Sequence, residues 1–222
     1  MQGFLDELQR GRVIAIVRGL DVALAVRAAE ALRAGGVTLI EITTDSPGWE
    51  DAVSQLAREA DHDGRFFVGT GTVMTVRHAE RACQAGATFL VSPVFSDDVA
   101  DFARERQVAY VPGALTPTEI HRAQTAGAAC VKVFPAGAVG PDYIRDLLQP
   151  LPALRLVPTG GITVDTATGY LEAGAIAVAL GSGLVNAAAL RANDSTPTRV
   201  AAERLLRRLA SGPSDHPTQG GV

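Results

Sequence analysis

The chain has 222 residues, of which 47% are hydrophobic and 5% aromatic, and its formal net charge is −4. This length and apolar fraction suffice for one sizeable core, arranged as a single α/β domain or as two small ones. The acidic balance argues against a nucleic-acid or anionic-membrane partner, since both require a basic surface.

Neither end of the chain indicates a targeting or membrane segment. The N-terminus lacks a basic stretch followed by a long apolar one, so we expect no signal peptide. Cys83 and Cys130 have no close pairing and are expected to be free thiols in a reducing cytosol, which predicts a cytoplasmic protein. We expect one domain over residues 1–211 and a disordered tail over 212–222, which is rich in Gly, Pro and Ser.

Short β-branched runs alternate along the chain with amphipathic helical stretches. An initial helix is expected at Phe4–Gln9. The expected strands are Val13–Arg18, Leu39–Thr44, Phe66–Thr70, Phe89–Pro93, Ala109–Pro112, Cys130–Pro135, Arg155–Thr159 and Ile176–Gly181. The expected helices that follow them are Asp21–Ala34, Trp49–Ala60, Thr75–Ala85, Asp97–Arg106, Thr118–Ala126, Pro141–Leu148, Asp165–Glu172 and Arg199–Ala210.

Strands that alternate with helices predict a parallel sheet. Ala-Gly pairs recur just before several strands, which indicates that one βα unit is repeated. Eight such units in this length predict an α/β fold of the (β/α)8 TIM barrel type, with the extra N-terminal helix covering its bottom. An open doubly wound sheet is the alternative, but no Gly-x-Gly-x-x-Gly follows the first strand.

Lys132 is the only lysine of the chain, and it lies in the apolar run Cys130–Phe134. An ammonium is costly to bury unless it is paired or loses its proton, and lysine can lose its proton whereas arginine cannot. Lys132 is therefore a candidate nucleophile that forms a Schiff base with a carbonyl substrate. The alternative is a structural ion pair with a nearby carboxylate.

Unusual polar residues fall late in the expected strands, where barrel enzymes place their chemistry. Glu41 is the clearest case, because a carboxylate between β-branched apolar residues is rare. It shares a face with Thr43, and if this face points inward Glu41 can act on Lys132 as a general acid and base. A structural pair with Lys132 or Arg18 is the alternative.

Glycine-rich segments follow the seventh and eighth expected strands, at Thr159-Gly160-Gly161 and Gly181-Ser182-Gly183. In many barrels these two loops bind a phosphate through backbone N–H groups, which glycine lets approach closely. Plain turns are the alternative. The histidines and cysteines have no metal-ligand spacing, so no metal or other cofactor is expected.

Three segments of the chain are distinctive: Val131–Ala136, Pro112-Gly113 with Thr116–Glu119, and Pro158–Gly161. Together they resemble the signature segments of the 2-keto-3-deoxy-6-phosphogluconate (KDPG) and 4-hydroxy-2-oxoglutarate (KHG) aldolase family, and Gly69–Thr72 adds support. The resemblance runs from about Arg12 to about Val185. It implies a metal-independent class I aldolase on a (β/α)8 barrel, usually a homotrimer, that acts on a small 2-keto-3-deoxy sugar acid phosphate and releases pyruvate.

The resemblance also implies roles for individual residues. Lys132 would form the Schiff base, and Glu41 would be the general acid and base. Gly160, Gly161, Gly181 and Ser182 would take the phosphate. The expected substrate-binding residues are Arg18, Thr43, Thr72, Pro93, Phe134 and Thr159.

Two positions depart from the family pattern. Asp45 stands where members that cleave KDPG often carry an arginine for the substrate carboxylate, and an aspartate would repel that group. Arg18 or backbone N–H groups then hold the carboxylate, or the preferred substrate is KDP-galactonate or KHG. Val94 replaces a common glycine. More distant alternatives are a phosphosugar isomerase or epimerase and a non-catalytic trimeric barrel.

Overall fold

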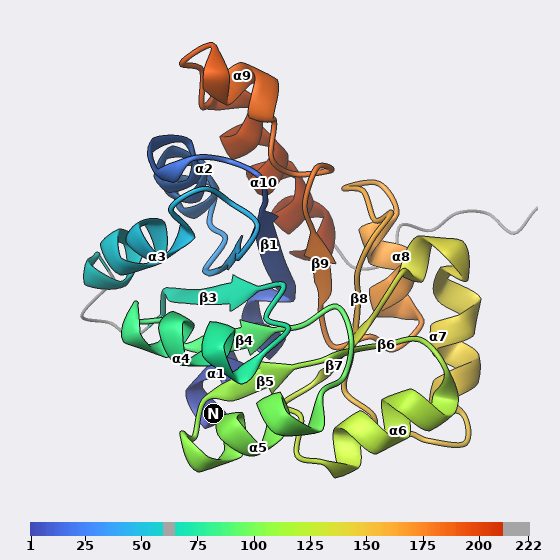
Figure 1. Ribbon diagram of the computed structural model, residues 1–222. Helices are drawn as coiled ribbons and strands as arrows, with labels where there is room; N and C mark the ends of the chain where they lie inside the picture. The colour runs from blue at the N-terminus through green and yellow to red at the C-terminus, as the bar shows by residue number, and fades with distance from the viewer. Residues whose placement is uncertain (60–64, 211–222) are drawn as a thin grey trace, which may run out of the picture.

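The computed structural model describes residues 1–59 and 65–210, in which helices and parallel strands alternate. Figure 1 shows the helices around the outside, with the strands between them. The α/β prediction is confirmed. The strands are β1 (Val13–Val17), β2 (Leu39–Thr43), β3 (Phe67–Gly71), β4 (Phe89–Val91), β5 (Ala109–Val111), β6 (Gly113–Ala114), β7 (Val131–Val133), β8 (Leu156–Pro158) and β9 (Val178–Leu180).

Several helices begin at a residue whose side chain caps the first turn. The side chains of Asp21, Thr75 and Ser96 each accept a hydrogen bond from a backbone N–H of the first turn, and Thr116 with Glu119 forms a capping box. The helices are α1 (Gln2–Gly11), α2 (Val22–Ala34), α3 (Trp49–Arg58), α4 (Val76–Gln84), α5 (Asp97–Glu105), α6 (Pro117–Thr125), the 3₁₀ turn η1 (Ala136–Ala138), α7 (Gly140–Leu148), α8 (Ala167–Glu172), α9 (Ala187–Arg191) and α10 (Thr196–Ala210).

The strands form two parallel sheets, in the orders β5-β4-β3-β2-β1-β9 and β6-β7-β8. The fifth expected strand, Ala109–Pro112, matches β5 and is one residue too long. Pro112, which has no N–H to donate, separates β5 from β6, a short strand that was not expected. At the other end of the smaller sheet, Thr159 and Ala179 form an isolated parallel bridge between the segments that hold β8 and β9. The two sheets therefore meet at both ends of the smaller one.

Alternating side chains along the strands divide the core into two clusters. The larger cluster fills the space between strands and helices and includes Ile40, Ile42, Val131 and Val133. The smaller one gathers the opposite strand faces and includes Leu39, Phe89 and Cys130. Helix α1 adds Phe4 and Leu8 to the smaller cluster, and the Phe4 and Phe89 rings lie 5.0 Å apart. This confirms the expected N-terminal helix over one end of the interior.

The expected tail over 212–222 and the last residue of the expected helix Trp49–Ala60 lie outside the described residues. Cys83 and Cys130 are both free thiols. In the described ranges no helix is long and apolar enough to cross a membrane. Helix α9 was not expected, and α10 starts three residues before the predicted Arg199.

Candidate active site

Lys132 belongs to the interior face of β7. Its neighbours Val131 and Val133 pack outward in the larger cluster, so the lysine between them points to the opposite side by strand alternation. The residue is only 5% exposed, and its Nζ lies 5.2 Å from the centroid of the Phe134 ring. The only lysine of the chain is thus held in a largely apolar site with one aromatic face over it.

Glu41 occupies the corresponding position on β2. It lies between Ile40 and Ile42 of the larger cluster and is 1% exposed, and both carboxylate oxygens are buried without a hydrogen bond. Burial raises the pKa of the Glu41 carboxyl, because the charged form loses its hydration. The positive charges of Lys132 and Arg18 lower this pKa, and the negative charge of Asp45 raises it.

Arg18 follows β1 and joins two neighbouring loops. Its Nη2 donates a hydrogen bond of 3.0 Å to Thr72 Oγ1, and its Nη1 lies 3.7 Å from Asp45 Oδ2. Thr72 follows β3 with φ of 60°, which is rare for a β-branched residue. The Thr72 carbonyl accepts a hydrogen bond of 2.9 Å from Thr44 Oγ1, which holds this backbone turn. The guanidinium is thus shared between a hydroxyl and a carboxylate.

A cavity of about 670 Å³ lies at the carboxyl ends of the strands. It brings together most of the predicted site residues, although they come from distant parts of the sequence. The lining includes Arg18, Thr72, Pro93, Lys132, Phe134, Thr159, Gly160, Gly161, Gly181 and Ser182. This size is in the range of small-molecule sites. Arg18 and Lys132 are the only cationic side chains among the described lining residues.

The two glycine loops lie together on one side of this cavity. Gly160 and Gly161 have φ of 87° and 76°, a conformation that L side chains rarely adopt. A β-carbon on Gly160 would also lie 2.9 Å from the Phe134 ring. Gly181 has no such restriction, since its nearest contact would be 3.7 Å away. The loop after β8 therefore requires glycine for conformation and space, and the Ser182 side chain beside it is exposed.

Thr43 is the one predicted substrate-binding residue that does not line the cavity. Its side chain is fully buried, and its hydroxyl lies 3.4 Å from the Val17 carbonyl and 3.2 Å from Ser46 Oγ. Ser46 in turn accepts a hydrogen bond of 2.9 Å from the Gly19 backbone N–H. Thr43 thus supports the turn next to Arg18, and Ser46, which the sequence did not single out, completes that support.

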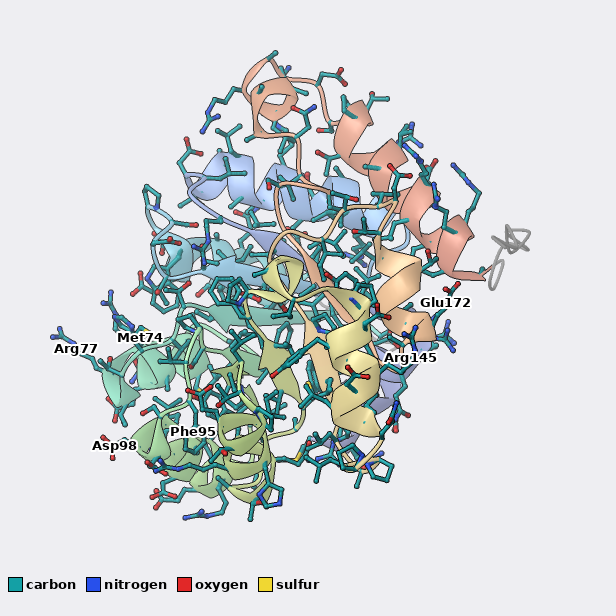
Figure 2. The ribbon with its side chains drawn as sticks, turned by 90° about the vertical axis from the view of Figure 1, so that its right-hand side faces the viewer. Met74, Arg77, Phe95, Asp98, Arg145 and Glu172 are labelled. Atoms are coloured by element: carbon teal, nitrogen blue, oxygen red, sulfur yellow. The ribbon has the colours of Figure 1, made fainter. Side chains whose placement is uncertain are left out.

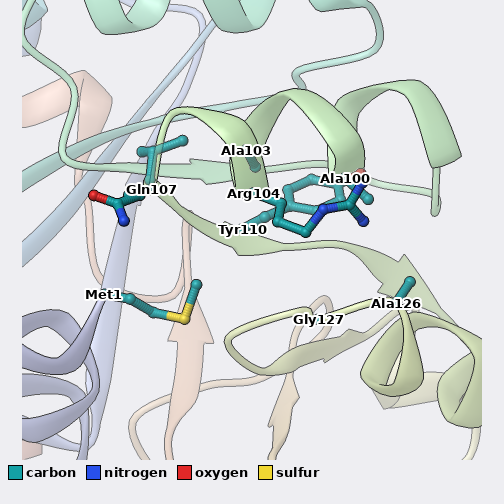
Figure 3. A pocket seen from close by; sticks show the side chains of 9 residues that line it. Met1, Ala100, Ala103, Arg104, Gln107, Tyr110, Ala126 and Gly127 are labelled. Atoms are coloured by element: carbon teal, nitrogen blue, oxygen red, sulfur yellow. The ribbon is translucent and has the colours of Figure 1, made fainter.

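A second cavity, of about 480 Å³, lies beside the amino end of β5 (Figure 3), and Lys132 is not among its lining residues. Small and apolar residues dominate its lining, and its arginine, Arg104, is paired with Asp101 at 2.8 Å. It holds no buried carboxylate or amine. Across residues 1–59 and 65–210, no group of three or more His, Cys, Asp or Glu could hold a metal ion. The cavity lined by Lys132 is therefore the candidate active site.

Comparison with known proteins relates this chain to a family of aldolases. The family model "KDPG and KHG aldolase" matches residues 5–200. A 2-dehydro-3-deoxy-phosphogluconate aldolase of Treponema pallidum is 34% identical over 91% of this chain and 95% of its own length. Among solved structures, "Native KDPGal structure" superposes with a TM-score of 0.82 at 28% identity, covering 90% of this chain and 94% of that one.

A designed assembly is also similar in structure. A cube-shaped protein cage made "by fusing symmetric oligomeric domains" superposes with a TM-score of 0.81 at 28% identity, over 90% of this chain and 73% of that chain. The match of the family model spans most of the chain and includes Lys132, Glu41 and both glycine loops. This chain therefore belongs to the KDPG and KHG aldolase family.

Proposed function

We propose that the protein is a class I aldolase that cleaves 2-keto-3-deoxy-6-phosphogluconate to pyruvate and glyceraldehyde 3-phosphate. The observation that carries this proposal is that Lys132 is buried and lines the cavity, while the buried, unbonded Glu41 faces the same interior, where burial raises its pKa and the charge of Lys132 lowers it. Imine formation needs an amine and a proton donor. Lys132 supplies the amine, and the Glu41 carboxyl, whose pKa burial raises, supplies the proton.

The reaction begins when the neutral Lys132 amine attacks the C2 carbonyl of the substrate and forms a carbinolamine. Glu41 gives a proton to the carbinolamine oxygen, which leaves as water, and a protonated imine remains. The C3–C4 bond then breaks, its electrons move into the imine to give an enamine, and the C4 hydroxyl passes its proton to the ionised Glu41 as the aldehyde departs. Protonation of the enamine at C3 and hydrolysis release pyruvate and restore the amine.

The surrounding residues bind the two ends of the substrate. Arg18 and Thr72 face the keto-acid carboxylate, because Arg18 is the cation of the lining other than the nucleophile. Phe134 and Pro93 lie along the pyruvate carbons. Thr159 and the backbone N–H groups of the glycine loops take the hydroxyl groups and the phosphate. None of these steps uses a metal ion or an organic cofactor.

The identity of the aldehyde product has a specific second candidate. Asp45 places a carboxylate 3.7 Å from Arg18, which weakens the hold on a substrate carboxylate, and the family also includes enzymes for KHG. Pyruvate release should therefore be measured on KDPG, KDP-galactonate and KHG. A kcat/KM at least tenfold higher on KDPG supports the proposal, and a preference for another substrate replaces it.

We further propose that the two sheets act as one closed (β/α)8 barrel and that three chains assemble. The bridge between Thr159 and Ala179 and the single-residue break at Pro112 support closure. Exposed Met74 and Val94, together with Phe95, support an interface, and Figure 2 shows Met74 and Phe95 on the same side of the molecule. Light scattering on the purified protein tests for a trimer.

The free thiols of Cys83 and Cys130 support a reducing, cytoplasmic location. Cys130 is buried, and burial raises its pKa to about 12, so it is an unreactive core residue. The net charge of −4 favours a small-molecule substrate over nucleic acid. Fractionation of the source cells with a specific antibody tests the location.

A further inference from the structure

Strand β3 presents two glycines, Gly69 and Gly71, on the face that looks into the interior. A β-carbon on Gly71 would lie 1.7 Å from Glu41 Oε1, 2.4 Å from its Cδ and 2.7 Å from its Cγ. These distances are far below any allowed contact, so the Glu41 carboxylate occupies the space that every other residue at position 71 would fill.

The constraint on Gly71 is one of volume alone. Its φ is outside the left-handed range that marks Gly160 and Gly161, so its backbone conformation is open to any residue. The register shows how the contact arises: Glu41 pairs with Gly69, and Gly71 lies two residues nearer the carboxyl end. The Glu41 side chain therefore leans along the strand toward the end where the cavity lies.

The Glu41 side chain cannot turn the other way along the strand, toward Gly69. A β-carbon on Gly69 would lie 2.5 Å from the Phe89 ring, so this ring already fills the space beside Gly69. Leu39 and Phe89 belong to the interior cluster and are fully buried. Glu41 has no hydrogen bond to fix its carboxylate, so packing against the bare α-carbon of Gly71 is what defines its position.

We propose that Gly71 is a positioning residue, which seats the Glu41 carboxylate at the end of the interior that faces Lys132. Gly71 is not among the residues that line the cavity, and having no side chain it offers no group for proton transfer. The inference rests on the proposed function, in which Glu41 transfers protons to the carbinolamine and to the enamine.

The prediction is a split between kcat and KM. General acid and base catalysis contributes on the order of 100-fold to 10,000-fold, so Gly71→Ala should lower kcat by at least about 100-fold. The KM should stay within about threefold, because the lining residues are unchanged. The ionisation of Glu41, which Lys132, Arg18 and Asp45 influence, should disappear from the pH profile of kcat.

The test is a double-mutant cycle of Gly71→Ala and Glu41→Ala, with Gly69→Ala as the matched control. Glu41→Ala removes the carboxylate, so the added methyl group fits and Gly71→Ala should lower kcat no further in that background. Gly69→Ala collides with the Phe89 ring, and should lower the melting temperature while the pH profile of the folded fraction stays unchanged.

An unchanged kcat and pH profile in Gly71→Ala would overturn the proposal, as would an equal loss of kcat in the Glu41→Ala background. If Gly71→Ala alone fails to fold, the double variant with Glu41→Ala is examined. A folded double variant shows that the added methyl group collides with the Glu41 side chain, as proposed. An unfolded one contradicts the proposal, because the glycine is then needed for another reason. The unsubstituted protein distinguishes this proposal from the proposed function. If it has no aldolase turnover, the proposed function is contradicted, whereas the folding of the variants still tests whether Gly71 positions the Glu41 carboxylate.

Discussion

Arg18 donates a hydrogen bond of 3.0 Å to the Thr72 hydroxyl and so joins the carboxyl ends of β1 and β3 beside the cavity. Thr72 holds its side chain there at φ of 60°, a conformation that costs a β-branched residue about 1–2 kcal/mol. Strained residues cluster at binding sites, and Thr72 lines the same cavity as Lys132. The strain places a hydroxyl and a guanidinium together at one side of the cavity.

Loss of the Thr72 hydroxyl should weaken substrate binding. Thr72→Val removes the partner of Arg18 and keeps the shape of the side chain, so KM should rise about tenfold, which corresponds to about 1.4 kcal/mol. Thr72→Ser keeps the hydroxyl and is the matched control, with a KM within about twofold of the parent. Steady-state kinetics on the preferred substrate measures both values. Equal KM values for the two variants would show that the hydrogen bond is not used.

Neutralising Asp45 should strengthen the hold on an anionic substrate. Asp45→Asn leaves Arg18 without its carboxylate neighbour, so KM should fall severalfold, most clearly at low ionic strength. The stability should change by less than about 1 kcal/mol, because the pair is exposed. Asp97→Asn breaks a similar exposed pair, with Arg122 at 2.6 Å, and should leave KM unchanged. A KM that rises in Asp45→Asn would instead make Asp45 a support for Arg18.

Substitution of Gly160 should separate phosphate binding from stability. Gly160→Ala forces alanine to φ of 87° and brings its β-carbon against Phe134, so kcat/KM on the phosphorylated substrate should fall more than about tenfold. Gly127→Ala is the control, since Gly127 has φ of 94° with no atom within 4 Å of an added β-carbon. Both should lose about 1–2 kcal/mol of stability. Equal kinetics in the two variants would remove Gly160 from the binding site.

Glu41 should make stability depend on pH in a defined direction. Burial raises its pKa above the ordinary value of 4.5, so the native state keeps a proton that the unfolded chain releases as pH rises through 4.5. The native protein therefore loses stability between pH 4.5 and the raised pKa. Glu41→Gln lacks this loss, so its melting temperature relative to the parent should climb through that range and then stay level. A constant difference at all pH values would contradict the raised pKa.

The fold was largely predictable because its signals are local. The alternation of apolar runs with amphipathic stretches predicted most elements to within a few residues, and local caps such as Asp21 and Thr116 begin helices α2 and α6. Arg155 was wrongly expected to begin a strand: it precedes β8, and its guanidinium donates 2.5 Å and 3.1 Å hydrogen bonds to the carbonyls of Ala129 and Ala128. Such an end depends on contacts with distant residues, which periodicity along the chain does not reveal.

The site was only partly predictable for the same reason. Lys132 and Glu41 could be found because charged residues in apolar strands are rare and alternation assigns their faces. Thr43 has the same alternation as Glu41, yet its hydroxyl is taken up by Ser46, a partner from the following turn. The role proposed for Gly71 could not be inferred from the sequence. It depends on the register between β2 and β3 and on the direction of the Glu41 side chain, which only the folded structure provides.

Reductive trapping shows whether Lys132 forms an imine with pyruvate, the step on which the proposed mechanism depends. The protein is incubated with pyruvate and sodium borohydride near neutral pH, and the product is examined by intact mass and peptide mapping. A Schiff-base mechanism predicts one pyruvyl adduct, on the peptide that contains Lys132, and none in Lys132→Arg. Since Lys132 is the only lysine, mapping need only separate it from the N-terminal amine. Absence of an adduct on Lys132 would contradict the class I aldolase mechanism.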